Sequence, residues 1–323
     1  MTPTPVKRRI RPAAAFAVAL LSISALGACG EKKEDLQVTD AANEAREELA
    51  EVEADFSGDP STFAQTTTIG SREREYMVTT PPNVEERENL PLIFVFHGYK
   101  MTDDSMRKIT EMNKANAVVV YMQGVNTAWA PAPYATTSGD EDLAFFDAVR
   151  REMLDKYPVN PARVFAAGHS NGGGFAAYTA CHRSHQLTGI ATVSAAYYDE
   201  VFEDCAPIPT KQIDFHGTKD NTIKYDGGVR HGAVYMPVSQ VMEKAAERNH
   251  CAPEPDVAEY SRPGEEFIWQ RCDAALRHYR LDGSTHIWPG ADGDKGPGEN
   301  TADDFATREI LDFFGVSYRD TLG

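Results

Sequence analysis

Short, continuously apolar runs alternate along this chain with stretches in which apolar residues return every three or four positions. The runs are typical of strands buried in a parallel sheet, and the spaced apolar residues are typical of amphipathic helices. The apolar runs 92–96, 117–121 and 164–167 are predicted to be buried strands, and further strands are predicted at 74–79, 190–194, 211–215, 267–272 and 276–281, which also contain polar residues. The predicted helices are 103–115, 140–157, one beginning at Asn171, 237–249 and a last helix bearing Phe305, Ile310 and Phe313, with Thr301-x-x-Asp304 as its capping box. This alternation predicts an α/β fold with a doubly wound, mostly parallel sheet and helices on both faces.

The first 28 residues have the pattern of an export signal. Four basic residues, Lys7, Arg8, Arg9 and Arg11, precede an apolar core at 13–26. The small residues that follow end at Cys29, and the whole resembles a bacterial lipoprotein signal. That resemblance implies that Cys29 is lipidated and anchors the mature chain to a membrane at the cell surface. The alternative is an ordinary cleaved signal with an incidental cysteine, which also predicts export.

The rest of the chain divides into a tether and one domain. Residues 29–61 are rich in Glu and Ala, which predicts a solvated acidic tether, and residues 62–323 suit one large catalytic domain. The formal charge is −17, and about −21 without residues 1–28, which hold four basic and no acidic residues. A surface this acidic repels phosphate backbones, so we expect no nucleic-acid partner.

Four cysteines follow Cys29, and an even number in an exported chain predicts two disulfides. Three pairings are possible. We favour Cys181–Cys205 and Cys251–Cys272, because each closes a short local loop. None of the four has the C-x-x-C spacing of a zinc site, so we expect no metal site.

A Gly-x-Ser-x-Gly element, Gly168-His169-Ser170-Asn171-Gly172, joins a predicted strand to a predicted helix. A strand that turns directly into a helix brings backbones close together, and glycines on either side of the turn permit that approach. The turn exposes the hydroxyl of its central serine at the helix N-terminus, where free N–H groups favour developing negative charge. We therefore predict that Ser170 is a nucleophile.

A serine nucleophile needs a base and an orienting carboxylate, which in this kind of fold follow it in the order acid, then histidine. Asp220 lies in the loop after the predicted strand 211–215, and it is better placed than Asp214, within the strand, or Asp226, farther along a Gly-rich loop. Among nine histidines, His286 alone follows both Ser170 and Asp220 and comes directly after a strand. The expected triad is therefore Ser170, Asp220 and His286.

An ester or amide attacked by Ser170 also needs donors for its oxyanion. One is expected to be the backbone N–H of Asn171, the residue after the nucleophile. The second should come from the loop after strand 92–96, at Gly98 or Tyr99, and we favour Tyr99. We also expect Trp129, in an irregular aromatic segment at 123–140, to contact substrate.

Four motifs in order carry a family resemblance. They are Phe96-His-Gly98, Gly168-His-Ser-Asn-Gly-Gly173, His216-Gly-Thr-x-Asp220 with Tyr225-x-Gly-Gly228, and Ser284-Thr-His-x-Trp288-Pro-Gly290. Together they look like the polyhydroxybutyrate depolymerase and feruloyl esterase family of secreted α/β-hydrolases, over about residues 70–315. The resemblance implies the same triad, the same two disulfides, no cofactor, and a place for Trp288 in the substrate cleft, with a core position as the alternative. The chain departs from the family at Tyr99, Lys100 and Met101, where members often have small residues.

The sequence thus predicts a serine carboxylic-ester hydrolase acting through an acyl-enzyme, on feruloyl or acetyl carbohydrate esters or on 3-hydroxybutyrate oligomers. Two alternatives remain. The same triad chemistry also suits a serine peptidase of this fold, and a surface lipoprotein could use the fold for binding alone.

Overall fold

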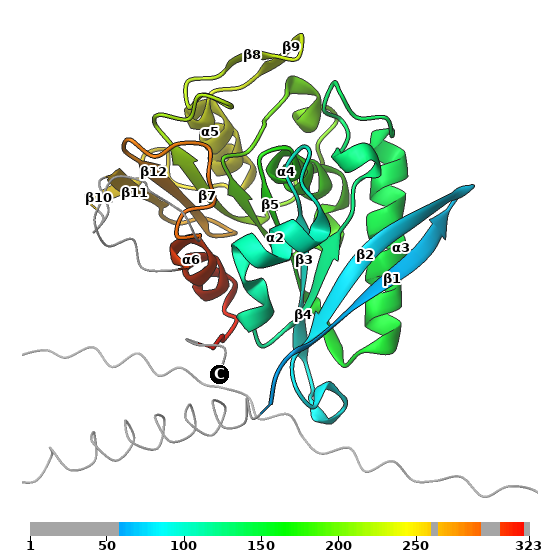
Figure 1. Cartoon of the computed structure of the whole chain (residues 1–323). Helices are drawn as coiled ribbons and strands as arrows, with labels where there is room; N and C mark the ends of the chain where they lie inside the picture. The colour runs from blue at the N-terminus through cyan, green and yellow to red at the C-terminus, as the bar shows by residue number, and fades with distance from the viewer. Residues whose placement is uncertain (1–57, 260–263, 292–303, 320–323) are drawn as a thin grey trace, which may run out of the picture. The chain divides into compact units, whose positions relative to one another are not determined.

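The computed structural model describes residues 58–259, 264–291 and 304–319 (Figure 1), so the predicted signal, Cys29 and all but the last residues of the tether lie outside the described residues. Ten strands form one sheet in the order β1-β2-β4-β3-β5-β6-β7-β12-β11-β10. Their bounds are β1 Ser61–Ile69, β2 Arg72–Thr80, β3 Leu90–Phe96, β4 Val118–Met122, β5 Val159–His169, β6 Gly189–Val193, β7 Lys211–Gly217, β10 Asp256–Glu259, β11 Gly264–Trp269 and β12 Leu276–Leu281. A separate hairpin consists of β8 (Gly228–Arg230) and β9 (Ala233–Tyr235).

The centre of the sheet is parallel. Strands β4, β3, β5, β6, β7 and β12 run in one direction. Antiparallel pairs extend the sheet at both sides, β2 and β1 beyond β4, and β11 and β10 beyond β12. The carboxyl ends of the parallel strands therefore meet at one edge, which is where ligands bind in sheets of this kind.

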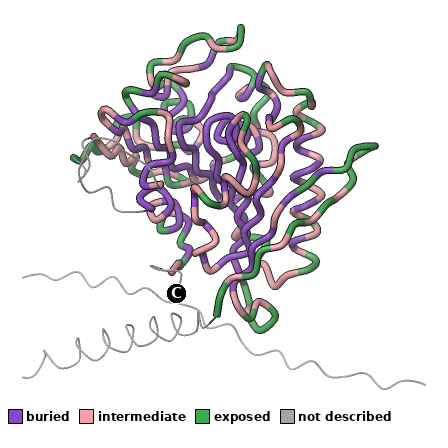
Figure 2. The backbone as a smooth tube through the Cα atoms, viewed as in Figure 1, coloured by how far each residue is buried: buried purple, intermediate pink, exposed green. Residues whose placement is uncertain are grey.

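Helices cover both faces of the sheet. The α-helices are α2 Asp103–Thr110, α3 Gly139–Lys156, α4 Asn171–Arg183, α5 Val238–Arg248 and α6 Phe305–Phe314, and short 3-10 helices lie at Val84–Glu86, Met112–Lys114, Val125–Thr127, Ser184–Gln186 and Asp199–Phe202. One core cluster joins the sheet to α3, α4 and α5, and the other joins it to α2 and α6. Figure 2 shows the buried backbone concentrated in the central strands between these layers. The predicted doubly wound, mostly parallel α/β architecture is thus confirmed.

Local differences from the sequence prediction have backbone causes. The predicted helix 103–115 ends at Thr110, because Glu111 adopts a left-handed conformation (φ 46°) that an α-helix cannot continue. The predicted strand 267–272 is displaced to Gly264–Trp269, because Arg271 also has positive φ (57°) and lies in a turn. Strands β1, β8, β9 and β10 were not predicted.

The expected capping box of the last helix is not formed by Asp304. This residue precedes α6 in a left-handed conformation, and its side chain caps no helix N–H. Its carboxylate instead pairs with the ammonium of Lys114 at 2.6 Å. The other half of the box, Thr301, lies outside the described residues.

Both favoured disulfides are present in the structure. Cys181–Cys205 ties α4 to the segment after the 3-10 helix Asp199–Phe202, and Cys251–Cys272 ties the end of α5 to the end of β11. In the described ranges, no helix combines the length and apolarity needed to cross a membrane.

Candidate active site

Ser170 lies at a strained turn between the end of β5 and the start of α4. Its backbone has φ 55° and ψ −117°, an unfavourable conformation for a residue with a side chain. Glycine is required on both sides: a Cβ at Gly168 would lie 2.1 Å from the carbonyl oxygen of Gly172, and one at Gly172 would lie 2.2 Å from that of Phe96. Helix α4 thus begins in direct backbone contact with the end of β3, as the Gly-x-Ser-x-Gly element predicts.

The structure brings together the three side chains predicted as a triad. His286 Nδ1 lies 2.7 Å from Asp220 Oδ2, and His286 Nε2 lies 2.9 Å from the Ser170 hydroxyl oxygen. Because the Asp220 carboxylate can only accept, Nδ1 carries the proton and Nε2 is left to accept from the serine hydroxyl. This is the hydrogen-bond relay that activates a serine nucleophile.

The loops that carry the acid and the base are packed on each other. A Cβ at Gly217, the last residue of β7, would lie 2.2 Å from the Ser284 carbonyl oxygen, and the Lys219 amide donates to that oxygen at 3.0 Å. The Asp220 side chain is fully buried, and its Oδ1 accepts from the amides of Thr222 and Ile223, both at 2.8 Å. Its free oxygen is thereby aimed at His286.

Two buried histidines surround the triad as neutral groups. Burial lowers the pKa of His216, whose Nε2–H donates to the Ile223 carbonyl at 2.8 Å and so fixes the loop that holds Asp220. Burial also lowers the pKa of His169 well below its usual value, and the nearby rings of His286 and His216 lower it further. Neither ring adds a charge beside His286 at neutral pH.

The two segments expected to supply the oxyanion donors meet at Ser170. A Cβ at Gly98 would lie 3.4 Å from the Ser170 Cβ. Within the described residues the Tyr99 amide is bonded to no acceptor, so it is available as a donor. Asn171 is the first residue of α4, where backbone N–H groups lack intrahelical acceptors.

Buried side chains form hydrogen bonds that stabilise the two segments expected to supply the oxyanion donors. The Asn171 amide group bonds the backbone N–H and C=O of Trp129 at 2.8 and 3.0 Å. His97 donates from Nδ1 to the Gly98 carbonyl and accepts the Gly124 amide at Nε2. Burial lowers the pKa of His97 to about 4, so the ring stays neutral and supports the loop rather than transferring a proton.

The expected substrate contacts of Trp129 and Trp288 are corrected by the structure. Trp129 is fully buried, stacks on Phe175 at 4.9 Å between ring centroids, and donates its indole N–H to the His97 carbonyl. Trp288 is 2% exposed and donates to the Thr307 hydroxyl at 3.0 Å. Both indoles are therefore core groups that support the loops near Ser170, and neither lines the cleft.

The cleft in front of Ser170 has a volume of about 280 Å³, and several residues of its wall, among them Tyr134, Tyr198 and Arg230, were not singled out from the sequence. Tyr99 stacks on Tyr134 at 4.1 Å, and His231 meets the Tyr134 ring edge-on at 4.7 Å. Tyr198 and Arg230 complete the aromatic and basic wall. The residues of this wall come from separate loops and from the β8–β9 hairpin. No local sequence pattern indicates that they lie together in the fold.

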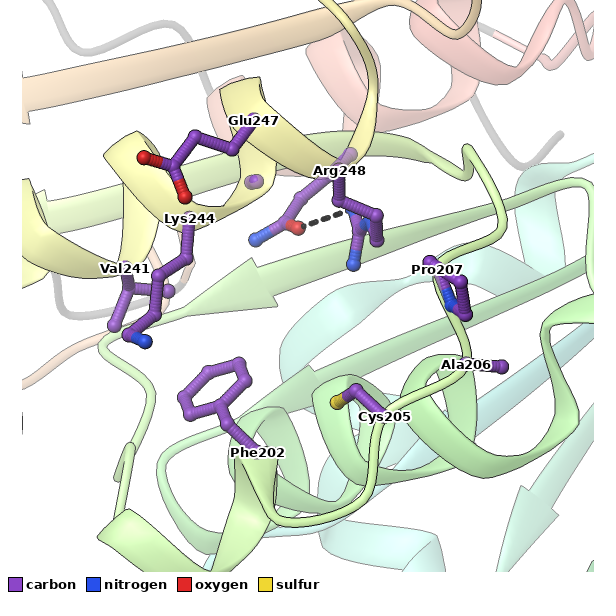
Figure 3. Close-up of a pocket in the computed structure, with 10 residues that line it drawn as sticks. Phe202, Cys205, Ala206, Pro207, Val241, Lys244, Glu247 and Arg248 are labelled. Atoms are coloured by element: carbon purple, nitrogen blue, oxygen red, sulfur yellow. Dashed lines mark hydrogen bonds between the residues drawn. The ribbon is translucent and has the colours of Figure 1, made fainter.

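A second hollow of about 270 Å³ lies between α5 and the segment of Phe202 and Cys205 (Figure 3). Its polar wall is Arg248, which donates to the Thr210 carbonyl and the Gln212 side chain at 3.2 and 3.1 Å. Burial lowers the pKa of Arg248 to about 10. None of the three triad residues lines this hollow. Across the described part of the chain, no group of three or more His, Cys, Asp or Glu side chains is arranged to hold a metal ion.

Several proteins of similar sequence are named as esterases. No protein-family model matches the chain. Feruloyl esterase D of Neurospora crassa is 25% identical over 276 residues, which is 77% of this chain and 84% of the relative. Feruloyl esterase B of Piromyces equi is 25% identical over 63% of this chain, but the match covers only 40% of that relative. The putative esterase NocK of Nocardia uniformis subsp. tsuyamanensis is 28% identical over 56% of this chain and 55% of the relative.

Solved structures agree on the fold. The acetyl xylan esterase of Aspergillus awamori superposes with a TM-score of 0.53 at 13% identity, covering 78% of this chain and 99% of that one. The S-formylglutathione hydrolase of Agrobacterium tumefaciens gives a TM-score of 0.52 at 13% identity, covering 81% and 96%. The chain therefore has the α/β-hydrolase fold, and its relatives and structural neighbours are esterases, which is consistent with a serine carboxylic-ester hydrolase.

Proposed function

We propose that the protein is a serine hydrolase that cleaves carboxylic esters through an acyl-enzyme. The observation that carries the proposal is the hydrogen-bonded series Ser170–His286–Asp220 at the strained turn before α4. A protein that only bound ligands would have no need of all three groups in this geometry. No cofactor enters the chemistry.

The reaction would proceed in two halves. The Ser170 oxygen attacks the ester carbonyl carbon while His286 Nε2 takes the hydroxyl proton, and Asp220 stabilises the resulting imidazolium. The amides of Tyr99 and Asn171 bind the oxyanion. His286 then gives the proton to the departing alcohol. In the second half His286 takes a proton from water, the hydroxide attacks the acyl group, and Ser170 regains its proton as the acid leaves.

The aromatic wall of the cleft supports a finer proposal, that the substrate contains an aromatic ring such as a feruloyl group. Rings at Tyr99, Tyr134 and His231 offer flat faces and edges on which such a ring can stack. An acetyl group and a 3-hydroxybutyrate unit have no aromatic ring to stack on this wall.

A substrate panel with an active-site label tests the proposal. We expect a fluorophosphonate probe to label wild-type protein at Ser170, and methyl ferulate to be hydrolysed with a higher kcat/KM than an acetylated sugar or a 3-hydroxybutyrate dimer. Hydrolysis of peptide anilides at a rate above that of the esters would favour a peptidase. A Ser170 that the probe does not label would favour a binding protein.

We also propose that the protein is exported and anchored through lipidated Cys29. The signal-like pattern of residues 1–28 and the two disulfides support export. In a bacterial host we expect the full-length protein to sediment with membranes and the Cys29→Ala variant to lose that association. A variant that stays in the membrane fraction would refute the anchor.

A further inference from the structure

The cleft in front of Ser170 has a charge opposite to that of the chain as a whole. The sequence has 49 acidic and 32 basic residues, a formal charge of −17. Among the thirteen residues that line the cleft, however, Lys100 and Arg230 are basic and none is Asp or Glu. A cleft lined by cations and by no carboxylate attracts anionic ligands, even in a protein whose net charge is negative.

Neither cation has a counter-charge among the described residues. In the described residues no carboxylate forms an ion pair with Lys100 or Arg230. The Lys100 ammonium lies 5.2 Å from the centre of the Tyr99 ring, so it faces an aromatic surface rather than an acid. Arg230 ends strand β8 of the hairpin, half-buried against the cleft.

The two cations act on the same part of the cleft. The pKa of the His231 ring is lowered by partial burial and then by the positive charges of Arg230 and Lys100. Tyr134 and Tyr198 cannot supply a counter-charge at neutral pH, because burial raises the pKa of both phenols. Within the described residues, the cleft therefore holds two positive charges near His231 that are paired with no carboxylate and are available to an anionic ligand.

We propose that the substrate carries an acidic group, such as a carboxylate, which binds Lys100 and Arg230 while its ester carbonyl lies at Ser170. The proposal rests on the ester hydrolysis proposed above and names a class of substrate for it: an aromatic ester with an anionic substituent. A carboxylate would gain charge-assisted hydrogen bonds to an ammonium and a guanidinium. The acid can belong to the acyl half or to the alcohol half of the ester.

Two pairs of matched esters distinguish these halves. Monomethyl terephthalate and methyl 4-carbamoylbenzoate differ only in an acid or an amide on the acyl half. The esters 4-acetoxybenzoate and 4-acetoxybenzamide differ in the same way on the alcohol half. We expect kcat/KM for the acid to exceed that for its amide by about tenfold in one of the two pairs. The ratio should fall as salt is added, because these charges are partly exposed.

Substitutions of Lys100 and Arg230 test whether these two cations cause the preference for the acid-bearing ester. Arg230→Gln and Lys100→Gln should each reduce the acid-to-amide ratio, and the double variant should bring it to about 1. The matched control is Arg151→Gln, which removes an exposed positive charge on α3 outside the cleft and should leave the ratio unchanged.

The outcomes separate this inference from the proposed function. If the ester bonds of both amide-bearing compounds are cleaved in a Ser170-dependent way and neither acid-bearing ester is preferred, the anionic substrate is refuted while the proposed esterase activity stands. A preference that survives the double variant also refutes it. If the fluorophosphonate probe labels no Ser170 and all four esters are left intact, the proposed function itself fails.

Discussion

Ser170→Ala is expected to lower kcat for methyl ferulate by about 10⁴- to 10⁶-fold, because the serine oxygen is the atom proposed to attack the ester carbonyl. The alanine removes the hydroxyl that His286 Nε2 holds at 2.9 Å, so no acyl-enzyme can form. The remaining donors and the cleft are untouched, so substrate should still bind. Steady-state kinetics and fluorophosphonate labelling measure the effect.

A matched serine provides the control for this variant. Ser239 is exposed on α5, away from the cleft, and Ser239→Ala should keep both turnover and labelling. The free energy of unfolding of each variant shows whether the fold is intact. A well-folded Ser170→Ala protein that retains a tenth or more of the wild-type turnover would overturn the assignment of the nucleophile.

Asp142→Ala is expected to lower the free energy of unfolding by about 3–5 kcal/mol. Both side chains of the Arg74–Asp142 ion pair are buried, with a separation of 2.9 Å. Asp142 also accepts the Ala130 amide at 2.9 Å and the Thr137 hydroxyl at 2.7 Å. Its removal leaves the Arg74 guanidinium charged and without its carboxylate in the core, and frees the segment next to Trp129. Urea unfolding measures the loss.

Two further variants test the cause. Asp140→Ala removes an exposed carboxylate from the same first turn of α3, and it should cost less than about 1 kcal/mol. Arg74→Met combined with Asp142→Asn removes both charges and keeps an acceptor for Ala130, so it should cost less than Asp142→Ala alone. A double variant as unstable as Asp142→Ala would show that the unpaired Arg74 charge does not account for the loss.

The sequence predicted the elements around Ser170 because their signals are local. Buried parallel strands such as 92–96 and 164–167 are continuously apolar, and the glycines at 168 and 172 specify a turn by their lack of a side chain. The order of the strands then brings Asp220 and His286 to the same edge, where the structure has His286 within hydrogen-bond distance of both Asp220 and Ser170.

Tertiary contacts explain what the sequence did not reveal. An indole at position 129 or 288 suits a cleft or a core equally well, and only the packing of Phe175 or Thr307 against it decides. Arg74 and Asp142 have charged neighbours in sequence, and no local pattern marks them as a buried pair, yet they are buried together. The edge strands β1 and β10 are largely exposed and lack a buried apolar run.

The close approach of α4 to the end of β3 has an evolutionary consequence. Main-chain atoms approach Gly168 and Gly172 so closely that neither position can accept a side chain. The turn that carries Ser170 therefore tolerates no substitution at these two positions. The β8–β9 hairpin, by contrast, contributes Arg230 and His231 to the cleft, and Val229 and Val234 remain 69% and 52% exposed on it. Substitutions in the hairpin can therefore change the substrate specificity of such a protein while Ser170, Asp220 and His286 keep their positions.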